Sequence, residues 1–405
     1  MSIRLHNLLH PFLMRIHLHA MLLGMIAVLL VLHGPAHAQQ STFVPKAKHA
    51  ILMDADSGAV LFQHEADELT PPASMSKLMT LAVVFKALKN GVLKPTDEIT
   101  MSEHAWRTGG APSGTSAMFV PINDKVTVDE LLQGIIVQSG NDACIAIAEA
   151  LAGTEEGFAQ VMTNEARRIG LKKSTFRNST GLYHPEHMMT MHELADLARY
   201  IMTEYADRFP LFAQKEFKYR KHRFFNRNPL LFLDIGADGM KTGYIKEAGY
   251  GIVGTAVQEG KRLIVVVNGL ESSNDRRDEA RRLLEWGFRS FGPFDLFKPG
   301  EVVGSARVWG GSSFYVPLVG KNGVTVVLPR YPANQRLSAE ILYKGPLKPP
   351  IRKGDQVARL RVSSSTSAVS EVPLYAAEDV DKAGILRQGL DSLIHLGFKW
   401  IKIKL

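Results

Sequence analysis

Three short motifs place the strongest constraint on the fold of this chain. In chain order they are Ser74-Met75-Ser76-Lys77, Ser139-Gly140-Asn141 and Lys241-Thr242-Gly243. Ser139 follows Ser74 by 65 positions and precedes Lys241 by 102 positions. Each pattern alone is short enough to occur by chance in a chain of ordinary composition. Their order is informative, because a fold that uses all three must bring three distant segments together.

A serine followed three positions later by a lysine can supply a nucleophile and its base. A serine hydroxyl is a weak nucleophile at neutral pH and needs an adjacent base to take its proton. Ser74 follows two prolines and opens an apolar stretch, and on a helix Lys77 lies one turn further along the same face. Burial and a neighbouring cation such as Lys241 would favour the neutral lysine that can accept a proton. The alternative for Ser74 alone is the N-cap of the helix.

The segments around the motifs predict an α+β fold with an antiparallel sheet. Residues 49–62 predict a hairpin around an Asp56-Ser57-Gly58 turn, and apolar residues at helical spacing from Met75 predict a helix that Gly91 stops. Further predicted elements are helices at 128–136, 143–152, 156–169, 191–202 and 276–286, and strands at 250–256 and 262–268. Strands and helices do not alternate regularly, which favours α+β over a parallel α/β fold.

The pattern changes near residue 292 to short strands separated by turn residues. The candidate strands are 303–309, 314–316, 324–328, 337–343, 357–362 and 369–375. They predict a small all-β domain over 298–378, after a larger domain over 41–292. Over 379–405, apolar residues share one helical face beside Trp400 and lysines, which predicts an amphipathic helix on a membrane surface. A helix packed on the β domain is the alternative.

Residues 1–38 predict an export signal. An uncharged apolar run at 21–32 follows a stretch with two arginines, and Ala36-His37-Ala38 supplies small residues where a signal peptidase cleaves. About twelve apolar residues are fewer than the roughly twenty that span a bilayer, which favours cleavage over a membrane anchor. The single Cys144 excludes an intramolecular disulfide, and export without disulfides points to a bacterial envelope.

The charge balance is mildly basic. The chain has 48 Lys+Arg against 40 Asp+Glu, a net charge of +8. This excess favours anionic polymers or lipid surfaces, and ordinary solubility accounts for it equally well. No run of five or more basic residues occurs, so we expect no nucleic-acid partner. His184-Pro185-Glu186-His187 and His192 do not have the spacing of a zinc helix, so we expect no metal or other cofactor.

Four stretches resemble the low-molecular-mass penicillin-binding proteins that are D-alanyl-D-alanine carboxypeptidases. They are Pro72-Ala73-Ser74-Met75-Ser76-Lys77-Leu78-Met79-Thr80, Gln138-Ser139-Gly140-Asn141-Asp142-Ala143-Cys144, Asn226-Arg227-Asn228 and Asp238-Gly239-Met240-Lys241-Thr242-Gly243. The resemblance covers the whole mature chain. It implies a penicillin-binding/β-lactamase-like catalytic domain, the β-rich second domain, and a C-terminal anchor on the periplasmic face of the bacterial inner membrane.

The resemblance also implies the reaction and its main residues. Ser74 would attack the penultimate D-Ala of a peptidoglycan stem pentapeptide, release the last D-Ala and leave an acyl-enzyme that water hydrolyses. Lys77 would be the general base, and β-lactams would inhibit the enzyme. The backbone N–H groups of Ser74 and Tyr244 would form the oxyanion hole.

The remaining implied roles concern substrate binding. Ser139 would relay protons, with Asn141 holding the substrate amide. Lys241, Thr242 and Gly243 would line the site near the terminal carboxylate, and Arg276 would bind that carboxylate because a guanidinium suits planar oxyanions. Arg227 would support the site. Surface ion pairs are the alternative for the two arginines.

Several readings of the same chain stay open. Tyr244-Ile245 stands where the family has His-Thr or a close variant, so a side-chain hydroxyl at 245 is lost. A class A β-lactamase would need a deacylating glutamate in a Glu-x-x-x-Asn loop, and none occurs between Asn141 and Lys241. An endopeptidase or weak transpeptidase would use the same acyl-enzyme. A catalytically dead peptidoglycan-binding protein is the non-enzymatic alternative.

Overall fold

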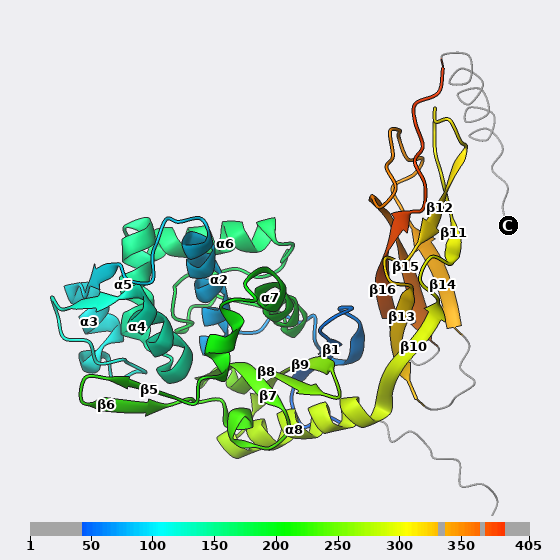
Figure 1. Cartoon of the computed structure of the whole chain (residues 1–405). Helices are drawn as coiled ribbons and strands as arrows, with labels where there is room; N and C mark the ends of the chain where they lie inside the picture. Colours follow the sequence, from blue (N-terminus) through cyan, green and yellow to red (C-terminus); the bar gives the residue numbers. More distant parts are fainter. Residues whose placement is uncertain (1–42, 331–336, 365–368, 385–405) are drawn as a thin grey trace, which may run out of the picture. The chain divides into compact units, whose positions relative to one another are not determined.

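The structure is a computed structural model of the chain, and it describes residues 43–330, 337–364 and 369–384. The first of these ranges begins with an α+β part and continues into strands alone (Figure 1). The predicted α+β class is therefore confirmed. The predicted export signal lies outside the described residues, as does the predicted C-terminal helix beyond residue 384.

An antiparallel sheet in the order β2-β1-β9-β8-β7 forms the centre of the first part. The predicted hairpin is confirmed, since β1 pairs with β2 and Asp54 Oδ1 accepts a hydrogen bond from Ser57 N in the turn. Side chains of β9 alternate between two cores: Ile264 and Val266 face one, and Val265 faces the other. The strands are β1 His49–Asp54, β2 Val60–His64, β7 Ala237–Ile245, β8 Gly249–Gln258 and β9 Lys261–Leu270.

Helices lie on both faces of this sheet (Figure 1). Helix α2 is apolar almost all round and is buried in the larger core, and the predicted stop at Gly91 follows its last turn in the left-handed region, at φ 72°. Helix α8 covers the other face, where Leu283 and Leu284 contact the second core. The helices predicted between residues 75 and 286 are confirmed, and α3 was not predicted. The helices are α2 Lys77–Lys89, α3 Glu103–Gly109, α4 Val128–Gln133, α5 Asn141–Ala152, α6 Glu155–Arg168, α7 Met191–Glu204 and α8 Ser273–Ser290.

Two short antiparallel strand pairs that the sequence patterns did not predict flank the helical layer, and the second of them is a hairpin. They pair β3 (Glu98–Thr100) with β4 (Lys125–Thr127), and β5 (Glu216–Tyr219) with β6 (His222–Phe225). Phe217 and Phe224 on the buried side of β5 and β6 join the larger core. Strands of three or four residues are too short to show a clear alternation in the sequence.

The remaining strands have a core of their own, which confirms the predicted all-β part. Their order is β11-β12-β16-β15-β14, and β10 pairs with β13. The strands are β10 Phe291–Phe297, β11 Val302–Arg307, β12 Tyr315–Val319, β13 Val324–Pro329, β14 Leu337–Leu342, β15 Gln356–Ser364 and β16 Val369–Ala376. Among the helices that the structure describes, none has the length and apolar character needed to cross a membrane.

Two expected boundaries need correction. Residues 293–297, which we placed between the domains, belong to β10 and pair with β13. Residues 379–384, where we expected a helix to start, are not helical. Val380 is fully buried and exchanges two backbone hydrogen bonds with Ile351, because its apolar side chain completes the core of the β part. The β part therefore extends past residue 378.

Candidate active site

Ser74 lies in a tight 3₁₀ turn, Ala73–Ser76, which leads directly into α2. The N-cap alternative is wrong, since the Ser74 side chain caps neither this turn nor α2. Ala73 has a φ of 49°, in the left-handed region that a residue with a Cβ seldom adopts. Gly181 packs so closely that a Cβ there would lie 2.1 Å from the Ala73 carbonyl oxygen. Close packing against Gly181, which lies in a distant segment of the chain, therefore fixes the turn that presents Ser74.

The Lys77 side chain reaches Ser74 from the next turn, as the spacing predicted. Lys77 Nζ lies 2.8 Å from Ser74 Oγ and 2.8 Å from Asn141 Oδ1, and it also donates to the Thr180 carbonyl. The Asn141 amide orientation is defined, because its Nδ2 donates to Thr115 Oγ1 at 2.9 Å. Two of the three neighbours of Nζ are thus acceptors only. A neutral amine satisfies this arrangement with its two N–H groups, and its lone pair then faces the Ser74 hydroxyl.

Burial makes that neutral form accessible. Lys77 is fully buried, and burial is the main cause that lowers its pKa to about 8, with the Arg227 charge acting in the same direction. Cys144 beside it is no counter-charge at neutral pH, because burial raises the pKa of this thiol to about 12. The predicted burial of Lys77 is what the structure shows. A base with a pKa near 8 suits proton transfer at neutral pH.

The second motif forms a bend at the start of α5. The π-helical turn Gly134–Gln138 ends at Ser139, whose φ of 64° lies in the left-handed region. Ser139 is 2% exposed, and its Oγ has no hydrogen-bond partner among the described residues. Asn141 N donates to the Ser116 carbonyl at 2.8 Å. This geometry leaves the Ser139 hydroxyl free to bond a ligand.

The third motif lies on β7, the edge strand of the sheet. Gly243 allows this strand to approach the nucleophile turn, because a Cβ there would lie 3.0 Å from the Pro72 carbonyl oxygen. Lys241 is buried and donates to the Thr242 carbonyl at 3.3 Å. Burial, followed by the charge of Lys77, lowers the pKa of Lys241 well below its ordinary value. An anionic ligand at this site would favour the charged lysine.

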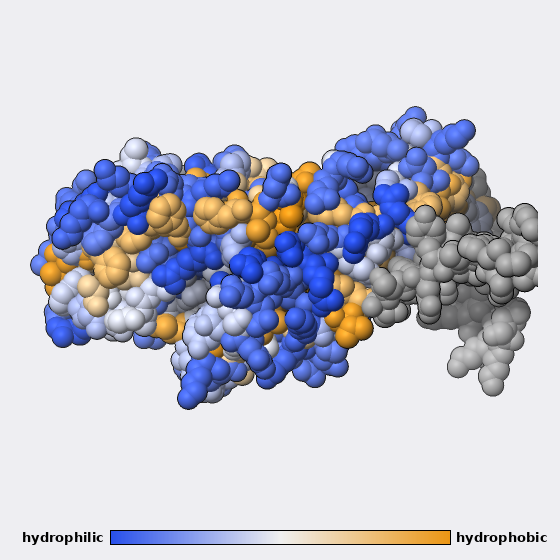
Figure 2. Space-filling view, turned by 90° about the horizontal axis from the view of Figure 1, so that it is seen from below, coloured by the Kyte–Doolittle hydropathy of each residue, from blue (hydrophilic) through white to orange (hydrophobic). Residues whose placement is uncertain are grey.

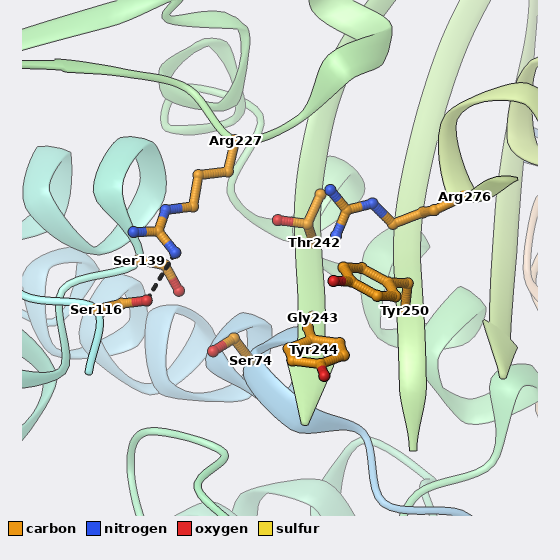
Figure 3. A pocket seen from close by; sticks show the side chains of 9 residues that line it. All are labelled: Ser74, Ser116, Ser139, Arg227, Thr242, Gly243, Tyr244, Tyr250 and Arg276. Carbon is orange, nitrogen blue, oxygen red and sulfur yellow. Dashed lines mark hydrogen bonds between the residues drawn. The ribbon is translucent and has the colours of Figure 1, made fainter. Parts of the chain in front are cut away.

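The two arginines reach the same cavity from opposite sides (Figure 3). Arg227 donates from Nη1 to Ser116 Oγ at 2.7 Å, and the Arg276 guanidinium stacks over the Tyr250 ring at 5.6 Å. Among the described residues neither arginine has an ion-pair partner, so the surface ion-pair alternative is wrong for both within that range. Arg276 is 9% exposed, its Nε has no partner among those residues, and burial lowers its pKa to about 10.

These groups enclose a cavity of about 430 Å³. Figure 3 shows the Ser74, Ser139 and Thr242 hydroxyls around it, with β7 on one side and the helical segments on the other. It is lined by Ser74, Ser116, Ser139, Arg227, Thr242, Gly243, Tyr244, Tyr250 and Arg276. The lining contains cations and hydroxyls but no carboxylate, so the cavity suits an anionic ligand next to a nucleophile. Among the described residues, no three side chains of His, Cys, Asp or Glu gather to hold a metal.

Comparison with known proteins identifies the family. The family model described as D-alanyl-D-alanine carboxypeptidase matches residues 36–272. The chain belongs to the D-alanyl-D-alanine carboxypeptidase family. A second model, the C-terminal domain of penicillin-binding protein 5, matches residues 291–382.

Bacterial members of this family match over most of the chain. D-alanyl-D-alanine carboxypeptidase DacC of Escherichia coli is 36% identical over 90% of this chain and 92% of its own. The crystal structure of penicillin-binding protein 5 from Haemophilus influenzae has 31% identity and a TM-score of 0.72, covering 84% of this chain and 99% of its own. Penicillin-binding protein D2 from Listeria monocytogenes, in the ampicillin-bound form, has 26% identity and a TM-score of 0.55 over 61% of this chain and 99% of its own.

Three residues of this carboxypeptidase-family site were missed by the sequence analysis. Thr180 contributes its carbonyl to Lys77, Ser116 binds Arg227, and Tyr250 supports Arg276. A backbone acceptor has no side-chain signature, and Ser116 lies in an irregular loop. Tyr250 begins the predicted strand that follows the third motif, and this position was the only feature of the sequence that could have placed Tyr250 near the site.

The departure from the family pattern after the third motif has a visible consequence. Tyr244 is 53% exposed and stacks on Tyr250 with ring centroids 4.2 Å apart. Tyr244, Tyr250 and Arg276 therefore form a continuous stack along one wall of the cavity (Figure 3). Ile245 is partly buried and offers no hydroxyl.

Proposed function

We propose that this protein is a serine D-alanyl-D-alanine carboxypeptidase that removes the terminal D-Ala from peptidoglycan stem pentapeptides through a Ser74 acyl-enzyme. The observation that carries the proposal is the contact between Lys77 Nζ and Ser74 Oγ, with two carbonyl oxygens on the other side of the amine. This arrangement makes a lysine the base of a serine nucleophile.

Acylation uses groups that already face the cavity. Lys77 takes the hydroxyl proton as Ser74 Oγ bonds to the carbonyl carbon of the penultimate D-Ala. The backbone N–H groups of Ser74 and Tyr244 receive the developing oxyanion, since the edge strand β7 leaves backbone donors unpaired on its outer side. The C–N bond then breaks, and the proton reaches the leaving amine of D-Ala through the free hydroxyl of Ser139.

The side of the cavity formed by Arg276 and Thr242 selects a substrate with a free C-terminal carboxylate. Arg276 offers a guanidinium with an unpartnered Nε, and Thr242 adds a hydroxyl on the same side of the cavity. The Tyr250 ring orients Arg276 where an acidic partner would otherwise do so. A substrate carboxylate can therefore bind without displacing an internal ion pair.

Intact mass spectrometry after addition of benzylpenicillin tests the acyl-enzyme directly. We expect a long-lived adduct of one drug molecule in the wild-type protein and none in Ser74→Ala. Rapid loss of the adduct with hydrolysed drug would instead identify a β-lactamase. An absent adduct in the folded wild-type protein would favour the non-enzymatic peptidoglycan-binding alternative.

A stem pentapeptide assay separates the remaining activities that share the acyl-enzyme. Release of free D-Ala without new cross-links is the expected result for a carboxypeptidase. Cleavage of cross-linked dimers as the main reaction would identify an endopeptidase, and transfer to an added amine acceptor would identify a transpeptidase. Ser74→Ala is the control for all three.

We also propose that the protein is exported and acts peripherally at the periplasmic face of the inner membrane. The support is the composition of residues 1–38 and the basic, Trp-containing C-terminal segment. Because residues 379–384 belong to the β part, the test removes residues 385–405 only. The full chain should sediment with anionic liposomes and the shortened chain should not. Equal sedimentation would contradict the proposed anchor.

A further inference from the structure

The β5–β6 hairpin concentrates positive charge beside the catalytic cavity. Its ten residues from 216 to 225 contain four Lys or Arg and one acid, Glu216, a net charge of +3 in a chain whose total is +8. Lys218 and Lys221 have no ion pair or hydrogen bond with any described residue. This segment therefore carries charge that the described parts of the protein do not neutralise.

The exposed face of the hairpin brings like charges together. Lys218 lies directly opposite Arg223 in the strand register, and both side chains are exposed. Like charges opposite each other in a sheet destabilise the pair. Arg223 also contacts Glu216, but its guanidinium lies 5.2 Å from the ring of Phe225, which is 57% exposed on the same face. The hairpin therefore combines an exposed apolar ring with two lysines, Lys218 and Lys221, that have no ion pair with any described residue, and this is the composition of a binding surface.

The tip of the hairpin is cationic as well. Tyr219 pairs with His222, so Arg220 and Lys221 form a two-residue turn. Arg220 has a φ of 51°, in the left-handed region where such turns favour Asn or Gly. The ion pair with Asp124 fixes Arg220 at this position, while Lys221 stays exposed and unpaired among the described residues.

The hairpin is anchored at the wall of the cavity. Asn226 closes its base by donating to the carbonyls of Gln214 and Lys215, and the next residue, Arg227, binds Ser116 in the cavity. Arg227 follows Arg223 by four positions along the chain, so their Cα atoms lie at most about 13 Å apart. A polymer that fills the cavity with one branch can therefore reach the exposed face of the hairpin with a neighbouring part.

We propose that this face, defined by Lys218, Lys221, Arg223 and Phe225, is an exosite for the acidic glycopeptide polymer whose stem peptides enter the cavity. The inference rests on the proposed carboxypeptidase function and adds a second contact to it. The free carboxylates of adjacent stem peptides would contact the cations, and a sugar ring would stack on Phe225. Figure 2 shows mainly hydrophilic residues with small hydrophobic groups on the side of the molecule that includes β5 and β6, which favours a hydrophilic polymer over a bilayer.

Co-sedimentation with insoluble peptidoglycan sacculi tests the exosite. The full chain carries Ser74→Ala to prevent turnover, and the test variant adds Lys218→Gln and Lys221→Gln, which break no ion pair or hydrogen bond between described residues. We expect binding to weaken about fivefold to tenfold at low salt and the difference to shrink at high salt. The matched control, Lys48→Gln with Lys172→Gln, removes the same charge at two other exposed sites and should bind like the parent.

A second measurement separates the exosite from the catalytic site. With Ser74 intact, the exosite variant should release D-Ala from a short soluble peptide at the parental rate. Phe225→Ser should weaken sacculus binding and also leave this rate unchanged. If neither the parent nor the variants release D-Ala, the proposed reaction is wrong. The sacculus co-sedimentation still tests the exosite in that case.

Two results would overturn the exosite. One is equal binding of sacculi by the exosite variant and the control variant. The other is loss of binding to anionic vesicles with unchanged sacculus binding, which would identify the hairpin as a membrane contact.

Discussion

Acylation of Ser74 should follow the titration of Lys77. The pKa of Lys77 is lowered to about 8 from an ordinary value of 10.5, chiefly by burial. At pH 7 about one Lys77 amine in ten is then neutral, against about one in three thousand for an unshifted lysine. The shift therefore raises the fraction of competent base about three-hundredfold. Because the pKa is lowered, the neutral form is gained as the pH rises through about 8.

The second-order rate constant for acylation by benzylpenicillin, measured from pH 5.5 to 10, reports this pKa in the free enzyme. We expect the rate constant to rise about tenfold per pH unit below pH 7 and to level off above about pH 8.5. Lys77→Arg is the control, because a guanidinium does not deprotonate in this range. It should acylate at least a thousandfold more slowly at every pH.

A rate constant that is flat between pH 5.5 and 7 would refute the reasoning, since it would mean that the base is already neutral or is a different group. A tenfold rise per unit that continues to pH 10 would refute it as well, because it would place the Lys77 pKa near the value of an exposed lysine. Burial would then not govern the base.

Three further predictions follow from individual contacts. Ser139→Ala should slow acylation about a hundredfold or more and leave the melting temperature unchanged, because the Ser139 hydroxyl has no partner to lose among the described residues; stopped-flow acylation and thermal unfolding check both parts. Arg276→Gln should lower kcat/KM about tenfold to a hundredfold for peptides with a free C-terminal carboxylate and much less for their C-terminal amides. Asp142 accepts hydrogen bonds from the backbone N–H groups of Met118 and Val120, so Asp142→Asn should cost about 2 kcal/mol of unfolding free energy in urea titration.

The fold was predictable where the sequence repeats a period long enough to read. Helix α7, whose buried and exposed residues alternate at helical spacing, was predicted over 191–202 and ends at Glu204. Strand β10 was not predicted, because Gly292 and Pro293 read as a linker. Pro293 is accommodated there because β10 pairs with β13 alone. Val380 carries no local signal for its bridge to Ile351, since that contact depends on the assembled β part.

The candidate site was predictable where side chains define the chemistry. The i, i+3 spacing of Ser74 and Lys77 is a local property of the chain, and the structure brings the two atoms within 2.8 Å. The Thr180 carbonyl could not be found this way, because any residue supplies a carbonyl and its position depends on the fold. The burial that tunes Lys77 is also a property of the assembled core. The sequence therefore predicts which residue types form the site, whereas the lowered pKa of Lys77 can be inferred only from the folded structure.

The cavity also explains why a peptide and a β-lactam should leave the enzyme at different rates. Its lining holds no carboxylate, so a hydrolytic water must be activated from the Lys77 and Ser139 side. A peptide loses D-Ala as a separate molecule, and water can take its place beside the acyl group. A β-lactam opens without losing its amine, which stays bonded to the acyl group, and in the proposed site its carboxylate would still face Thr242 and Arg276. Water is then kept from the ester by the ligand itself. A persistent penicillin adduct therefore follows from the geometry that binds the substrate carboxylate, and it requires no separate inhibitory site.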